Sequence, residues 1–365
     1  MQLDNSKFFL SLVRLGINHD TFCQPIQLTG GQSIFVDWEE IQTLAMQQGL
    51  YAIVIDGIEK LPDGLRPPKQ MLLEWFGEVL QGYEYRYESY CRTIAEMAAF
   101  YNNHNLKMMV IKGYACSLNW PKPEHRPCGD IDIWQFGEYK KADALVAAKK
   151  GINIDTSHHH HTVFKWNDFT VENHYDFINV HHHRSHKKFE KILKRLGQDS
   201  SYTVDVLGEK VYLPSPNLHA LFLLKHLMLH FASGEIRLRM LLDWAFFVEK
   251  HGKDINWVWL NETLDSYGLI TIYGVLNAIC ISELGFKSTL FPNVQFSPDL
   301  KDRVFKEILC PEVPNNRQSH LIRRVIWKYK RWKANEWKHK LCYKESMWSA
   351  FWSGVWSHLL KPSSI

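Results

Sequence analysis

The sequence lacks closely paired cysteines. Its seven cysteines are scattered over 365 residues without a CxxC pair, whereas a disulfide framework or a zinc ribbon needs paired spacing. Runs of roughly 18 apolar residues, the length of a membrane-spanning helix, are also missing. The first residues include Asp4 and no small-residue cleavage site, which argues against a signal peptide. We therefore expect a cytoplasmic protein with reduced thiols.

Low-complexity sequence and strong net charge are absent too. The net charge of +4 is too small to indicate a nucleic-acid partner by itself. The chain is longer than one core usually needs, and its patterns suggest three regions. Residues 1–89 and 213–365 are mostly helical in pattern, whereas residues 90–212 mix helix and strand signals. The sequence thus predicts an α+β protein with a mixed-sheet core between helical N- and C-terminal regions.

The central region has a distinct order of predicted elements. After a helix over 90–104 come a buried strand over 108–111, an alternating strand over 130–134, a helix over 140–149 and two strands over 158–165 and 169–178. Asn167 and Asp168 favour a tight turn between the last two strands. A two-residue turn would place Trp166 opposite Phe169, Val163 opposite Glu172 and His161 opposite His174.

Two aspartates alternate with isoleucines in the strand over 130–134. Asp130 and Asp132 would therefore share one face of the sheet, with Ile131 on the other. Adjacent carboxylates repel each other, and a divalent cation is the usual way to stabilise them. An isolated pair is weak support, however, because acidic residues often alternate on solvent-facing strands.

Neighbouring motifs strengthen the metal hypothesis. Lys112 and Gly113 follow one strand, Arg126 precedes the aspartates, and Glu172 occupies an alternate position on a later strand. A glycine turn lets the backbone approach phosphate oxygens, basic side chains neutralise them, and a third carboxylate adds a hard oxygen ligand. Together these residues indicate phosphate chemistry.

This order resembles the DNA polymerase beta-like nucleotidyltransferase superfamily and, more closely, an uncharacterised bacterial nucleotidyltransferase family, over about residues 90–250. The resemblance implies that Asp130, Asp132 and Glu172 bind Mg²⁺ or Mn²⁺. A nucleoside triphosphate, held by Lys112, Gly113, Arg126 and Ser117, would donate its nucleoside monophosphate to a hydroxyl acceptor on a small molecule, a protein or RNA, releasing pyrophosphate.

One departure supports an alternative function. The superfamily's glycine is usually followed by Gly or Ser, whereas Tyr114 follows Gly113 and Ser117 lies further along. A nucleotide-binding or regulatory protein without turnover is therefore the second hypothesis.

Histidines are concentrated at 158–161 and 181–183. The hairpin register places His159, His161 and His174 on the face of Glu172, where we favour a pocket-lining role over a zinc site, since no cysteine joins them. Lys225 and Arg239, on later helices, are minor candidates for the same pocket. Arg239 and Asp243 have the spacing of an ion pair on a helix surface.

The C-terminal segment is basic and rich in tryptophan. Between Leu321 and Lys344 there are nine Lys or Arg residues and one acid, and Trp348, Trp352 and Trp356 repeat at helical spacing. Packing onto the protein body is the favoured interpretation. An adaptor role at an anionic membrane surface or on RNA is the alternative.

Overall fold

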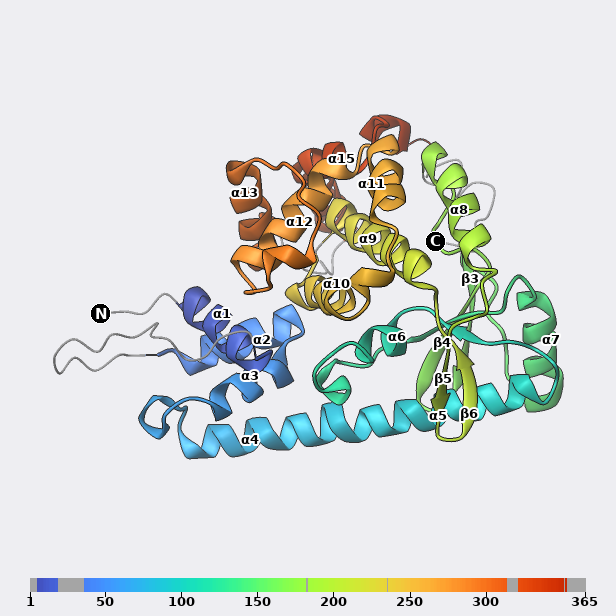
Figure 1. Ribbon diagram of the computed structural model, residues 1–365, viewed down its shortest axis with the longest axis horizontal. Coiled ribbons are helices and arrows are strands. Elements are labelled where there is room, and N and C mark those ends of the chain that lie inside the picture. Colours follow the sequence, from blue (N-terminus) through green and yellow to red (C-terminus); the bar gives the residue numbers. More distant parts are fainter. Residues whose placement is uncertain are drawn as a thin grey trace.

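The computed structural model describes residues 5–18, 36–181, 183–234, 236–313, 321–350 and 352. It confirms the α+β class, with a six-stranded mixed sheet and mostly helical content. In Figure 1 the strands lie between a long helix at the bottom of the view and helices α8 and α9 above them. Within the described part of the chain, every helix is too short or too polar to cross a membrane.

The N-terminal region is helical, as predicted. It contains α1 (Asn5–Gly16), α2 (Trp38–Gln48), α3 (Tyr51–Glu59) and α4 (Lys69–Val79). The Asp37 side chain accepts a hydrogen bond from the Glu40 amide and caps α2. A π-helical turn (Leu80–Glu84) joins α4 to α5 (Tyr85–Asn102), so that the chain passes from the N-terminal helices to the sheet along one long helix (Figure 1).

The sheet has the strand order β3-β4-β2-β1-β6-β5. Its strands are β1 (Met109–Val110), β2 (Ile131–Trp134), β3 (His161–Trp166), β4 (Phe169–His174), β5 (Thr203–Val206) and β6 (Glu209–Tyr212). The β2–β4 and β1–β6 pairs are parallel and the others antiparallel. The pairing predicted for the hairpin is confirmed, with Val163 opposite Glu172 and His161 opposite His174. The β5–β6 hairpin was not predicted.

The remaining helices follow β1 in the sequence. They are α6 (Gly113–Ser117), α7 (Tyr139–Lys150), α8 (Arg184–Leu196), α9 (Pro216–Ser233), α10 (Leu238–His251), α11 (Trp257–Ser266), α12 (Ile270–Ser282), α13 (Pro298–Leu309), α14 (Leu321–Ala334) and α15 (Glu336–Cys342). Gly151 ends α7 with a φ of 66°, in the left-handed region that glycine tolerates. The sequence patterns predicted most of these helices, but not α6 or α8.

Two apolar clusters hold the fold together. One lies between α5, α7 and one sheet face, and includes Ile131, Ile133 and Val171. The other joins the opposite sheet face to the helices of both the N-terminal and C-terminal regions. Since Asp132 alternates with Ile131 and Ile133, its side chain lies on the face directed toward this second cluster. The candidate site is thus located where the sheet meets the helical body.

Candidate functional site

Asp132 and Glu172 lie side by side in the sheet. They are directly paired residues of the parallel strands β2 and β4, and neighbouring strands are about 4.8 Å apart. Side chains at paired positions of adjacent strands point to the same face. The fold therefore brings together two carboxylates that are far apart in the sequence.

Basic groups surround the buried carboxylate of Asp132. Its Oδ1 atom lies 2.5 Å from the Lys112 Nζ atom and 3.0 Å from the His174 Nε2 atom. Burial alone would raise the pKa of Asp132, but Lys112 and His174 outweigh it and hold that pKa well below its usual range. The pKa of Lys112 is raised, because the attraction of Asp132 and Glu172 exceeds the effect of burial. Asp132 and Lys112 are thus both ionised at neutral pH.

Two histidines contact Glu172. Its Oε2 atom lies 3.4 Å from His174 Nε2 and 3.7 Å from His161 Nδ1. The other ring nitrogen of His174, Nδ1, is 3.1 Å from the Asp176 carbonyl oxygen. A carbonyl only accepts hydrogen bonds, so Nδ1 is the protonated donor and Nε2 points toward both carboxylates. His161 and His174 thus lie beside the carboxylates, and their role in lining a substrate pocket stays a prediction.

Asp130 is placed at the edge of this cluster. It precedes β2 and is exposed, and partial burial together with the charges of Glu172 and Asp132 raises its pKa. Its side chain is outside the groups of convergent ligand atoms. Asp132, Glu172 and His174 form one such group, with one ligand atom from each within 4.8 Å of the others. The role of Asp130 as a metal ligand therefore stays a prediction.

A second group of ligand atoms consists of three histidines, His160, His161 and His174. The His160 and His161 rings are 4.2 Å apart, and the Nδ1 atoms of both are buried without a hydrogen-bond partner. The hairpin register does not extend to His159, whose ring lies 5.1 Å from that of His181. Residues 158–160 form a bend before β3, so the strand alternation assumed for them does not apply.

Gly113 is required where it stands. Its φ is +26°, and a Cβ atom there would lie 2.3 Å from the Tyr90 hydroxyl oxygen. That hydroxyl donates a hydrogen bond of 2.9 Å to the Asp130 carbonyl oxygen. The glycine thus lets α5 hold the segment that leads into β2.

The Arg126 guanidinium group forms an ion pair with another carboxylate, that of Asp243. Its Nε and Nη2 atoms donate to the two oxygens of Asp243, at 2.7 and 2.9 Å, and both side chains are buried. The predicted surface pair between Arg239 and Asp243 was therefore wrong, since Asp243 is buried and its oxygens are bound by Arg126. In this structure Arg126 fixes α10 to the loop before β2.

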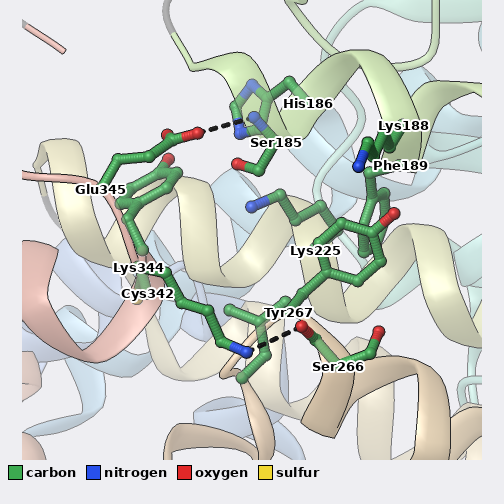
Figure 2. A pocket seen from close by; sticks show the side chains of 12 residues that line it. Ser185, His186, Lys188, Phe189, Lys225, Ser266, Tyr267, Cys342, Lys344 and Glu345 are labelled. Atoms are coloured by element: carbon green, nitrogen blue, oxygen red, sulfur yellow. Dashed lines mark hydrogen bonds between the residues drawn. The ribbon is translucent and has the colours of Figure 1, made fainter. Parts of the chain in front are cut away.

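The other predicted residues, Ser117, Arg239 and Lys225, contact groups other than the three carboxylates. Ser117 Oγ donates to the Tyr114 carbonyl and contacts the Tyr87 hydroxyl. Arg239 is half-buried and packs near Gly49. Lys225 lines a different cavity, shown in Figure 2, whose lining includes none of the three carboxylates.

The C-terminal tryptophans divide into two groups. Trp337 packs on Phe231 of α9, with ring centroids 5.5 Å apart, and beneath the Arg303 guanidinium. Trp348 and Trp352 are 60% and 57% exposed. Trp356 lies outside the described residues. Packing thus accounts for Trp337, and the membrane or RNA role of the rest stays a prediction.

Comparison with known proteins identifies the family. A family model described as an uncharacterised nucleotidyltransferase matches residues 35–281. The chain belongs to this uncharacterised nucleotidyltransferase family. The family predicted from the motifs is confirmed, and its match extends further toward both ends than the motifs did. The wider polymerase beta-like superfamily and a bacterial origin stay predictions.

Other comparisons add little. No curated protein matches the sequence. A crystal structure of an antigenic nucleotidyltransferase-like protein from Paracoccidioides brasiliensis matches at 15% identity and a TM-score of 0.32, over 44% of this chain and 75% of that one. This similarity is too low to support a conclusion about the site.

Proposed function

We propose that this nucleotidyltransferase-family protein transfers a nucleoside monophosphate from a nucleoside triphosphate to a hydroxyl acceptor, with the help of a divalent cation. The main support is the convergence of Asp132, Glu172 and His174, whose ligand atoms lie within 4.8 Å of one another. Two carboxylates and an imidazole that are buried or partly buried are a typical ligand set for a divalent cation.

The residues fit Mn²⁺ better than Mg²⁺. The Asp176 carbonyl fixes the protonated nitrogen of His174 and leaves Nε2 facing Asp132 and Glu172, which is the usual arrangement around a metal-binding histidine. Either a proton on Nε2 or a cation bound to it could link the His174 nitrogen to the carboxylate oxygens of Asp132 and Glu172. Mg²⁺ prefers oxygen ligands, whereas Mn²⁺ accepts imidazole nitrogen more readily. A bound cation would supply charge neutralisation at the phosphate groups.

Lys112 would hold the phosphates. Its ammonium group bridges Asp132 and the α9 side of the site, 5.9 Å from the Phe222 ring. The half-buried His226 follows one turn later on α9, and burial and the charge of Lys112 both lower its pKa, so it stays neutral. Phosphate oxygens could therefore lie between the positively charged Lys112 ammonium group and the neutral imidazole of His226.

The proposed transfer is a substitution at the α-phosphorus. The acceptor oxygen forms a bond to phosphorus, the bond to the β-phosphate oxygen breaks, and pyrophosphate leaves with the electron pair. The acceptor proton passes to the carboxylate of Glu172. Asp130, exposed beside β2, would assist as a further ligand of the cation.

Pyrophosphate release from a panel of nucleoside triphosphates, with Mg²⁺ or Mn²⁺, tests this function. We expect release to be faster with Mn²⁺ and to disappear in Asp132→Ala. Asp168→Ala is the matched control, because this exposed aspartate lies in the β3–β4 turn, and it should behave as wild type. His174→Gln should reduce the preference for Mn²⁺. Equal rates in Asp132→Ala and wild type would refute the proposal.

Nucleotide binding without turnover is the second candidate. It is favoured by Lys112, which already neutralises the Asp132 oxygen that a cation would need. Triphosphate binding by calorimetry, without pyrophosphate release under any metal, would establish this alternative. Binding should then weaken in Lys112→Met and remain in Asp132→Asn.

A further inference from the structure

A cavity of about 490 Å³ lies apart from the carboxylate cluster. Figure 2 shows its walls, which come from the start of α8, the middle of α9, the end of α11 and the segment after α15. Its volume is within the range of small-molecule sites in proteins. None of the groups that contact Asp132 or Glu172 lines it.

Lys225 is the central polar group of this cavity. Its side chain is only 3% exposed, and its amino group is directed into the space between the walls (Figure 2). Among the residues that the structure describes, no hydrogen bond or ion pair to Lys225 is present. Its neighbours are instead the rings of Tyr343 and Phe189, with Nζ 4.7 and 5.5 Å from their centroids. A buried ammonium group without an acceptor is costly.

Two other charged residues of the lining, Glu345 and Lys344, are paired within the chain. The Glu345 carboxylate accepts hydrogen bonds from the Ser185 amide at 2.7 Å and from His183 at 3.1 Å, and so caps the start of α8. Lys344 donates to the Ser266 carbonyl at 2.8 Å. Among the described residues that line the cavity, Glu345 is the one acid, whereas Lys188, Lys225 and Lys344 are basic. The excess positive charge calls for an anion from outside the chain.

The apolar walls define the rest of the ligand. Phe189, Tyr267, Leu269 and Tyr343 contribute ring and aliphatic surface around Lys225. We propose that this cavity binds a small organic anion, whose phosphate or carboxylate group pairs with Lys225 and whose apolar body packs on Tyr267, Leu269 and Tyr343. The site is independent of the proposed nucleotide transfer, because the two share no residues.

Calorimetry on the full chain with four probes tests the site. Phenyl phosphate and benzoate should bind, inorganic phosphate should bind more weakly, and neutral benzyl alcohol should not bind. Comparison of the first two distinguishes a phosphate from a carboxylate ligand. Lys225→Met should weaken binding at least tenfold, or about 1.4 kcal/mol. Lys187→Met, which removes an exposed lysine of α8 that does not line the cavity, should bind as wild type.

A second measurement does not depend on a variant. An amine-acylating reagent followed by mass spectrometry reports the reaction rate of Lys225, with Lys187 as the internal reference. Phenyl phosphate should slow acylation of Lys225 and leave that of Lys187 unchanged. Equal binding by wild type and Lys225→Met, or probes that leave the acylation rate of Lys225 unchanged, would overturn the proposal. Loss of binding in Lys112→Met alone would assign the anions to the carboxylate site instead and refute it as well.

Discussion

Arg126 offers a direct test of whether a predicted phosphate ligand is in fact structural. Arg126→Met removes two charge-assisted hydrogen bonds, of 2.7 and 2.9 Å, and leaves the 5% exposed Asp243 without its counter-charge. Removing one partner of a buried pair costs about 3–5 kcal/mol. Trp120 Nε1 still donates to Asp243 at 2.9 Å, which compensates in part. We therefore expect the free energy of unfolding to fall by about 3 kcal/mol.

Urea unfolding followed by tryptophan fluorescence and circular dichroism measures this change. Arg92→Met is the control, since Arg92 and Glu88 form an exposed pair at 3.8 Å, and it should change stability by less than about 0.5 kcal/mol. The double variant Arg126→Met with Asp243→Asn should lose less than the sum of the single variants. If Arg126→Met leaves stability unchanged but weakens triphosphate binding, Arg126 is a phosphate ligand and the structural interpretation is wrong.

Three further predictions concern stability. Gly113→Ala should lose about 1–3 kcal/mol, because its new Cβ meets the Tyr90 hydroxyl at a φ of +26°, and adding Tyr90→Phe should recover part of that loss in urea titrations. Asp37→Ala should cost about 0.5–2 kcal/mol through loss of the α2 cap, and an unchanged urea midpoint would contradict this. Burial lowers the pKa of Lys225 from 10.5 to about 8, so the unfolded chain keeps this proton more tightly, and stability should rise between those pH values by about 3 kcal/mol. Lys225→Met should lack that rise and be more stable than wild type at pH 7, and parallel pH profiles would exclude the effect.

The local parts of the site could be predicted from the sequence. A two-residue turn fixes the register of the β3–β4 hairpin, and so the pairing of His161 with His174 needed no tertiary information. Alternation likewise predicted the sheet face of Asp132. Which strand would lie beside β2 could not be predicted in this way, because the parallel pairing with β4 is made only when the whole sheet assembles.

The missed features depend on contacts that are distant or locally unusual. Arg126 and Asp243 are separated by 117 residues, and no sequence pattern near either residue predicts their pairing. His160 joins the histidine group from a bend rather than from a strand. The β5–β6 turn places Leu207 at a φ of 52°, which is uncommon for a branched side chain and hid this hairpin from pattern analysis.

The helical N-terminal region contacts the helical C-terminal region directly. Arg14 donates to the Glu283 carbonyl at 2.8 Å, and Gln48 links the Ile308 carbonyl to the Leu238 amide. Removing either the N-terminal or the C-terminal region would therefore expose buried apolar side chains of the other. We expect that neither region folds as an independent fragment.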